Sequence, residues 1–346
     1  MVRPMTKSRT NLRFIFWGTP EFAAASLLAL LDAGFEPYAV VTSTDKVSGR
    51  GMKLKASPVK ELALLHNIPV WQPASLKDPL FIQELKESNP DFMLVVAFRM
   101  LPKEIIEVPP GGTWNLHASI LPDLRGAAPI HWALRLGYRQ TGLTVFKIQY
   151  EIDTGDVLDS VKLDIPKDWN AGNLHDRMAV EGGKLLVKAV PNIFDGNYQL
   201  RPQDQFNLDQ NALNKAPKIQ RTDALIDWSK DSQSLVNFIR AFAPNPGAYT
   251  FLNGTRIVLI DATEEEPLWE SILPKENVND IDADKLLAQT VLPGHCLTLG
   301  NKWWIKTQSS WLRIKQIKPE NSKSMPVDAY LRGHSDVMGK ICSREL

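Results

Sequence analysis

The chain has 346 residues, of which 44% are hydrophobic and 23% charged, and its formal net charge is +1. This length is sufficient for two domains with separate cores, and the balanced charge gives no sign of a strongly acidic or basic partner. No apolar run approaches the ~18 residues of a membrane span. The two cysteines, Cys296 and Cys342, lie far apart, which excludes a Cys-rich zinc framework or a disulfide scaffold and fits a reducing cytosol.

The first half of the chain alternates strand-like and helix-like runs. The first dozen residues carry three cations but no apolar signal-peptide core, so we expect a loose extension of a cytoplasmic protein. An apolar run from Arg13 to Trp17 then leads through the turn Gly18-Thr19-Pro20-Glu21 into an Ala- and Leu-rich helix. Further strands are expected at 38–42, 68–71, 92–97, 144–150 and 157–163, and helices from Pro58 and at 80–88, 130–136 and 172–193. This alternation predicts an α/β domain with a Rossmann-like, doubly wound, mostly parallel sheet.

Two loops of this domain bear on the ligand class. The turn at Gly18 lacks the later glycines of a dinucleotide fingerprint and the lysine of a P-loop, so NAD and ATP are poor candidates. The segment from Thr44 to Lys55 has two glycines, four cations and a single Asp, without the period of a helix or strand. We expect a mobile basic loop suited to contact with a phosphate backbone. Charge alone, however, favours a solvated loop that binds nothing.

The most informative stretch runs from Trp114 to Pro129 and reads WNLHASILPDLRGAAP. Asn115 and His117 lie at the end of a strand-like run, and their i, i+2 spacing puts both side chains on one side of an extended backbone. Open α/β sheets bind ligands at the carboxyl ends of strands. Asp153, in the later turn IDTGD, could supply a carboxylate that holds or charges the imidazole. Taken singly, such residues often only cap a turn.

The second half of the chain predicts a different fold. A polar, Gln- and Asn-rich stretch at 199–218 is expected to link a domain at 11–198 to a smaller one at 219–334. Short β-runs at 249–252, 256–260, 296–299, 302–306 and 311–317 indicate a small, OB-like β-barrel. An acidic segment from Glu264 to Asp284 is expected to be an exposed insertion. The last strands interleave lysines and arginines with tryptophans, which fits nucleic-acid contact, although aromatic residues in small barrels are more often core.

The combined string Asn-x-His-x-Ser, Leu-Pro, Arg-Gly-Ala-Ala-Pro-Ile and Asp-Thr-Gly-Asp resembles the 10-formyltetrahydrofolate-dependent formyltransferases. The turn from Gly18 to Phe22 and the Gly-Arg-Gly core of the basic loop are similar to the branch of that family that acts on methionyl-tRNA. This resemblance implies transfer of the formyl group of 10-formyltetrahydrofolate, a co-substrate, to the α-amino group of methionyl initiator tRNA. It implies no metal and no obligate protein partner.

The resemblance also implies a set of site residues. The expected catalytic residues are Asn115, His117 and Asp153; the folate-binding residues Ser119, Ile120, Leu121 and Pro122; and the tRNA-binding residues Lys46, Arg50 and Lys53. Asn115 would donate a hydrogen bond to the tetrahedral oxyanion, and His117 would stabilise it or manage protons with the leaving nitrogen.

Three segments depart from the family pattern. The loop Phe98–Leu101 is one residue short and contains Arg99, which could be a site cation or an exposed arginine. Gln149 and Glu151 stand where the family usually has Asp and Gly, so this loop has a different backbone, an extra carboxylate near the site, or a solvent-facing Glu151. Asp123 and Leu124 replace an Arg-Trp pair often found beside the folate segment.

Rival interpretations remain within and outside this chemistry. A glycinamide ribonucleotide or sugar-nucleotide N-formyltransferase would share Asn115, His117 and Asp153, but the former usually lacks the second domain and the Gly-Arg-Gly loop. A formyltetrahydrofolate hydrolase would use the same residues on water. A non-catalytic tRNA- or folate-binding protein could keep the fold, but the intact triad argues against it.

Overall fold

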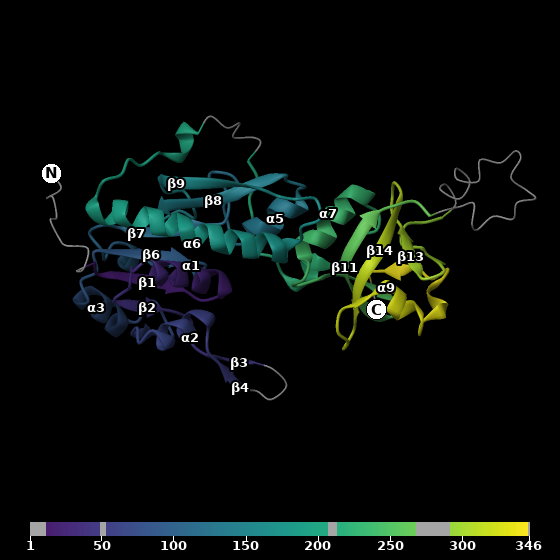
Figure 1. Cartoon of the computed structure of the whole chain (residues 1–346), viewed down its shortest axis with the longest axis horizontal. Helices are drawn as coiled ribbons and strands as arrows, with labels where there is room; N and C mark the ends of the chain where they lie inside the picture. The colour runs from purple at the N-terminus through teal and green to yellow at the C-terminus, as the bar shows by residue number, and fades with distance from the viewer. Residues whose placement is uncertain (1–11, 49–52, 207–212, 268–290, 345–346) are drawn as a thin grey trace, which may run out of the picture. The chain divides into compact units, whose positions relative to one another are not determined.

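The structure, a computed structural model, describes residues 12–48, 53–206, 213–267 and 291–344. Contacts between residues divide the chain into two compact units. Figure 1 shows the chain coloured by residue number, from purple at the N-terminus to yellow at the C-terminus. The first unit comprises Met1–Pro129, Arg139–Ile165 and Leu174–Pro217, and the second comprises Ile130–Tyr138, Pro166–Asn173 and Lys218–Leu346. No helix among the described residues is long and apolar enough to cross a membrane. The expected amino-terminal extension, Arg50 and most of the acidic insertion lie outside the described residues.

The first unit is built on one sheet with the strand order β5-β2-β1-β6-β7-β8-β9. The strands β5, β2, β1, β6 and β7 pair in parallel, and β8 and β9 continue the sheet in antiparallel pairing. The bounds are β1 Phe14–Gly18, β2 Ala39–Val41, β5 Val70–Trp71, β6 Phe92–Val96, β7 Thr113–His117, β8 Gln140–Lys147 and β9 Val157–Asp164. The expected Rossmann-like, mostly parallel sheet is confirmed.

Four helices connect the parallel strands of this unit: α1 Glu21–Asp32, α2 Pro58–Leu65, α3 Pro79–Glu87 and α4 Lys103–Ile106. A longer helix, α6 Ala171–Asp195, follows β9, and its residues from Leu174 onward belong to this unit. The sequence sets their starts, because the hydroxyl of Ser57 accepts the N–H of Lys60 and Asp78 caps α3 in the same way. In each of these two helices a proline occupies the first turn, where its missing N–H costs nothing.

The two faces of the sheet follow from the alternation of side chains along β7. Leu116 points toward α6, where a side chain at Gly182 would meet it, and α6 also packs on α1 through Gly183 and Ala29. Asn115 pairs with Val95 in register and therefore belongs to the opposite face. Val95 is part of the buried cluster that includes Phe81 and Leu85 of α3 and Ile105 of α4. Asn115 and His117 consequently share the α3 and α4 face.

The basic segment is more regular than expected. Lys46–Ser48 (β3) and Lys53–Lys55 (β4) form a two-stranded antiparallel ribbon in which Val47 faces Leu54. The expectation of an irregular loop is therefore wrong for these residues. The two glycines that suggested a loop, Gly49 and Gly51, lie between the strands and outside the described residues.

The second unit contains a single antiparallel sheet with the order β12-β13-β14-β11-β10-β16, and β15 pairs with β14. Its two ends are joined by a bridge between His295 and Ile341, which brings the first and last strands together as a small barrel. The strands are β10 Ala248–Leu252, β11 Thr255–Glu264, β12 Cys296–Leu299, β13 Lys302–Lys306, β14 Trp311–Pro319, β15 Met325–Pro326 and β16 Cys342–Ser343. The helices are α5 Pro129–Arg135, α7 Ser232–Phe242 and α9 Val327–Leu331. The expected small β-barrel is confirmed.

Aromatic residues fill this barrel. Trp303, Trp304 and Trp311 are all buried, so they form core rather than an exposed stacking surface. The two cysteines, distant in sequence, also meet inside the unit, with 3.5 Å between the Sγ atoms of Cys296 and Cys342. Both are free thiols.

Most of the stretch expected to link the domains, 199–218, belongs to the first unit, which extends to Pro217. Arg201 exchanges two backbone hydrogen bonds of 2.9 Å with Val157 of β9. Farther along, the N–H of Ala216 donates to the carbonyl of Arg125 at 2.8 Å, and the N–H of Leu124 donates to the carbonyl of Asn214 at 2.8 Å. The described residues of this connecting segment, 199–217, therefore contact β9 at Arg201 and the turn after β7 at Asn214 and Ala216.

Candidate active site

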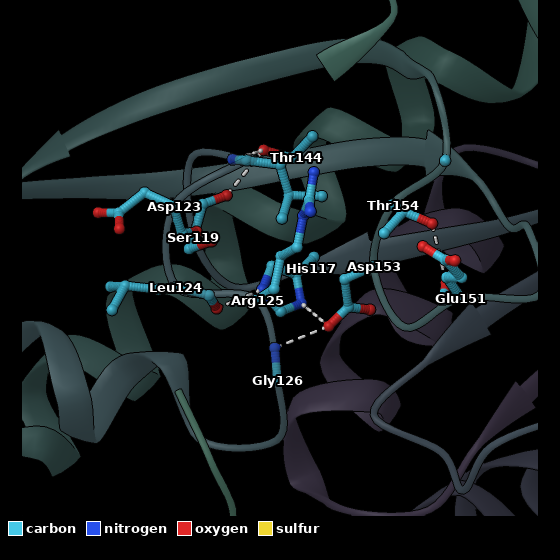
Figure 2. A network of polar contacts seen from close by, with 12 residues as sticks. His117, Ser119, Asp123, Leu124, Arg125, Gly126, Thr144, Glu151, Asp153 and Thr154 are labelled. Atoms are coloured by element: carbon cyan, nitrogen blue, oxygen red, sulfur yellow. Dashed lines mark hydrogen bonds and ion pairs between the residues drawn. The ribbon is translucent and has the colours of Figure 1, made fainter. Parts of the chain in front are cut away.

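His117 occupies the carboxyl end of β7 and is only 6% exposed. Its Nε2 atom lies 3.0 Å from the carbonyl oxygen of Leu124. Because a carbonyl can only accept a hydrogen bond, Nε2 must carry a proton. On the other side of the ring, Nδ1 lies 3.7 Å from Oδ2 of Asp153, as Figure 2 shows. The imidazole is thus held between a main-chain carbonyl and a carboxylate, and its charged form provides donors toward both.

Asp153 reaches His117 from the loop between β8 and β9. Its Oδ2 also accepts the N–H of Gly126 at 2.9 Å, so one carboxylate oxygen faces both the imidazole and the turn after β7 (Figure 2). Asp153 has φ of +55°, and Leu124 has φ of +57°. Such values are rare for residues other than glycine, and here they occur at the two residues whose oxygens face the His117 ring.

Gly155 is needed in this loop for close packing of the backbone. The residue with the left-handed conformation is Asp153, not the glycine. A Cβ atom at Gly155 would lie 1.7 Å from the carbonyl oxygen of Lys147. The glycine therefore permits close approach of two backbone segments, which brings the loop against the end of β8.

The segment expected to bind folate forms a tight turn after β7. Ser119 is buried, and its hydroxyl donates to the carbonyl of Asp123 at 2.6 Å. Thr144 of β8 donates to the carbonyl of Ser119 at 2.7 Å and accepts the N–H of Leu121 at 3.1 Å. The Leu121-Pro122 peptide is cis. The Ser119 hydroxyl therefore stabilises the turn, as Figure 2 shows. Ile120 is the half-buried member of the segment.

Asn115 and His117 lie in the arrangement that the sequence indicated. They share one face of β7, and in register Asn115 stands beside Phe146 and His117 beside Thr144 of β8. Asn115 is half-buried. The structure therefore brings Asn115, His117 and Asp153 to one edge of the sheet.

Two of the three segments that depart from the family pattern, those with Arg99 and Glu151, place these side chains in solvent. Arg99 is exposed, and its guanidinium donates to the carbonyl of Pro73 at 2.8 Å. Phe98 packs edge-on against Trp17, with 5.5 Å between ring centroids. Glu151 is exposed as well. Of the possibilities weighed for Arg99 and Glu151, the structure supports a surface arginine and a solvent-facing glutamate.

The basic ribbon offers Lys46 to solvent, since this residue is exposed on β3. The only acid of the segment, Asp45, is engaged elsewhere: the Lys60 ammonium donates to it at 2.7 Å and Gln72 at 2.8 Å. These hydrogen bonds lower the pKa of Asp45. The charge of the Asp45 carboxylate is thus neutralised by Lys60, and the ribbon keeps its positive charge. The main chain of Lys53 lies in β4.

Several site contacts carry no sequence signal. The carbonyl of Leu124 and the N–H of Gly126 are main-chain groups, which every residue offers. Gln203, in the short 3-10 turn Gln203–Gln205 of the connecting segment, is buried and touches both Arg125 and the Asp153 loop. Only its burial in an otherwise polar stretch distinguishes it, and burial cannot be read from one sequence.

No group of three or more His, Cys, Asp and Glu residues with a metal-binding arrangement occurs among the described residues. An amide, an imidazole and a carboxylate lie together at the end of a central strand. These functional groups are the ones used in proton transfer and acyl-type group transfer. Fold and site together define an α/β enzyme with a carboxyl-terminal barrel.

Comparison with known proteins gives the family. The formyl transferase family model matches residues 11–190, and the model of the formyl transferase C-terminal domain matches residues 218–335. The chain therefore belongs to the formyl transferase family.

Curated relatives resemble the chain over nearly its whole length. A methionyl-tRNA formyltransferase from Azobacteroides pseudotrichonymphae is 39% identical over 96% of this chain and 98% of its own length. Another from Ruminiclostridium cellulolyticum is 37% identical over 93% and 97%, respectively.

Among solved structures, two N-formyl transfer or folate-binding proteins share the fold. HypX from Aquifex aeolicus in complex with tetrahydrofolic acid has a TM-score of 0.56 and 19% identity, over 93% of this chain and 47% of its own. The N-formyltransferase from Helicobacter canadensis, in complex with folinic acid and dTDP-3-aminofucose, has a TM-score of 0.61 and 17% identity, over 91% of this chain and 100% of its own.

Proposed function

We propose that this enzyme transfers the formyl group of 10-formyltetrahydrofolate to the α-amino group of methionyl initiator tRNA. The observation that carries the proposal is the geometry around His117, whose ring lies between the Leu124 carbonyl and the Asp153 carboxylate beside Asn115. Full-length similarity to methionyl-tRNA formyltransferases supports the choice of acceptor. The proposed substrates imply a reaction in the cytoplasm during translation initiation.

The proposed chemistry begins with attack of the amine nitrogen on the formyl carbon. The carbonyl oxygen becomes an oxyanion, the attacking nitrogen loses a proton, and N10 of the folate leaves with a proton. The Asn115 amide would donate a hydrogen bond to the oxyanion, a type of contact whose loss slows catalysis by about 10²-fold or more. No metal takes part in these steps.

His117 is proposed to stabilise the oxyanion and to supply the proton taken up by the leaving nitrogen. Its Nε2–H is held by the Leu124 carbonyl, whereas the 3.7 Å between Nδ1 and Asp153 exceeds hydrogen-bonding distance. The Nδ1 proton would therefore be available to the oxyanion or the leaving nitrogen.

The remaining site residues keep their expected roles as part of the proposal. Ser119, Ile120, Leu121 and Pro122 would line the folate side of the site, with Ser119 acting through the shape of the turn. Lys46, Arg50 and Lys53 would contact the phosphate backbone of the tRNA, and the exposure of Lys46 supports this role.

The test is formyl transfer from 10-formyltetrahydrofolate to methionyl initiator tRNA, with glycinamide ribonucleotide as a competing acceptor. Transfer to the tRNA should be lost in His117→Ala and retained in His66→Ala, because His66 is an exposed residue at the end of α2. Formate release without an acceptor would instead indicate a hydrolase, and formylation of the nucleotide alone would overturn the tRNA assignment.

A further inference from the structure

The connecting segment places a buried glutamine against the site. Gln203 is 4% exposed and lies between the ranges matched by the two family models, 11–190 and 218–335. A buried side-chain amide is costly unless its hydrogen bonds are made. The contacts of Gln203 therefore indicate what holds it there.

Each polar atom of the Gln203 amide has two partners. Its Nε2 donates to the carbonyl of Asp153 at 2.9 Å and to the carbonyl of Gly155 at 2.7 Å. Its Oε1 accepts from Nε of Arg125 at 3.0 Å and from Nη2 of Arg125 at 2.6 Å. This uses the full capacity of a primary amide, which has two N–H donors and two acceptor lone pairs.

The orientation of this amide is unambiguous. Carbonyl oxygens cannot donate and a guanidinium cannot accept, so only one placement of the oxygen and nitrogen satisfies Arg125, Asp153 and Gly155 together. Substitution by Glu would keep an acceptor for Arg125 but lose both donors. Substitution by Leu would remove all four bonds at similar volume.

The two segments joined by Gln203 are the ones that position His117. Arg125 stands between Leu124, whose carbonyl contacts Nε2 of His117, and Gly126, whose N–H donates to the Asp153 carboxylate. Asp153 itself faces Nδ1 of His117. Gln203 thus ties together the turn on one side of the imidazole and the loop on the other.

We propose that Gln203 is a positioning residue, which holds the Asp153 loop against the turn at Arg125 and so fixes the carboxylate relative to His117. The connecting segment is suited to this task because Arg201 is itself anchored to Val157 by two backbone hydrogen bonds. This inference rests on the proposed function for its effect on catalysis, but the structural coupling can be measured without any substrate.

The kinetic test uses the full-length enzyme with Gln203→Leu, Gln203→Glu and the matched control Gln205→Ala, an exposed residue of the same turn. Both Gln203 variants should lower kcat by about 10- to 100-fold, as expected for a small displacement of a catalytic group, with KM for the tRNA changed by less than about threefold. Gln205→Ala should behave as wild type.

A double-mutant cycle distinguishes positioning from loss of stability. If Gln203 acts through Asp153, then Gln203→Leu should reduce kcat far less in an Asp153→Asn background than in wild type. Equal fold-changes in the two backgrounds would overturn the proposal, even if Gln203→Leu also unfolds at a lower temperature.

Hydrogen exchange at the Gly126 amide provides the test that needs no substrate. Its N–H is bonded to Asp153, so release of the loop in Gln203→Leu and Gln203→Glu should speed exchange by at least about tenfold, with no change in Gln205→Ala. Unchanged exchange would overturn the positioning role. Faster exchange in an enzyme that does not formylate tRNA would refute the proposed function while leaving this role intact.

Discussion

The charge of Asp153 can be removed with little change to its loop, which makes Asp153→Asn a sharp test of the catalytic arrangement. Asparagine adopts positive φ more readily than most residues, and its oxygen can still accept the Gly126 N–H. With Nδ1 of His117 at 3.7 Å and an effective dielectric constant of about 20, the lost attraction to a charged imidazole is about 4 kcal/mol. Part of this contribution is present before the transition state, so we expect kcat/KM to fall by about 10²- to 10³-fold.

The assay is formyl transfer to methionyl initiator tRNA under single-turnover conditions, beside thermal unfolding of the same preparations. The thermal unfolding midpoint of Asp153→Asn should differ from that of the wild type by no more than about 2 °C, because the hydrogen bond to Gly126 is kept. Asp153→Ala provides the comparison, since it loses both the charge and the acceptor and adds strain at positive φ. Activity of Asp153→Asn within about threefold of wild type would refute the electrostatic role.

Three further changes probe the ribbon, the loop and the barrel. Lys46→Ala should weaken tRNA affinity by about two- to fivefold without changing kcat and should reduce the salt slope of tRNA binding by about one, whereas Lys86→Ala on α3 should do neither. Gly155→Ala should lower both activity and the thermal midpoint, because its Cβ would lie 1.7 Å from the Lys147 carbonyl oxygen, which belongs to the main chain. Lys306→Met should raise stability at pH 7 by about 1 kcal/mol, measured by urea unfolding. Burial lowers the pKa of Lys306 in the folded protein below 10.5, its value in the unfolded chain. Between the folded and the unfolded pKa, the unfolded chain binds more protons, so the free energy of unfolding of the wild type rises with pH. The stability advantage of Met should therefore shrink as the pH approaches 10.5.

The sequence predicted strands best where burial leaves a continuous apolar run. The ends of β1 and β6 differ by about one residue from the expected ranges, 13–17 and 92–97, because both faces of these strands are covered. β11 was expected to end at Ile260 but continues to Glu264, since a register shift between Leu259 and Ala262 interrupts its alternation. α7 begins at Ser232, after an Asp231 cap that lies in a polar stretch of the chain.

The site was predictable where chemistry resides in a side chain on a regular element. Asn115 and His117 follow from the i, i+2 spacing along β7, and the family pattern indicated Asp153. What the sequence could not provide is the second layer of contacts. The Leu124 carbonyl faces His117 because of a left-handed residue in the turn, and Gln203 reaches the loop from 50 residues beyond Asp153. Such pairings depend on tertiary structure and leave no periodicity in the chain.

The course of the connecting segment has a consequence for dissecting this enzyme into parts. A fragment cut at residue 198, where the sequence suggests that the first domain ends, would lose the partner of Val157 at Arg201 and the backbone partners of Leu124 and Arg125 at Asn214 and Ala216. A catalytic fragment that keeps these bonds must therefore extend at least to Pro217, where the first unit ends. Exchange of barrels between relatives should likewise join the chains after this point.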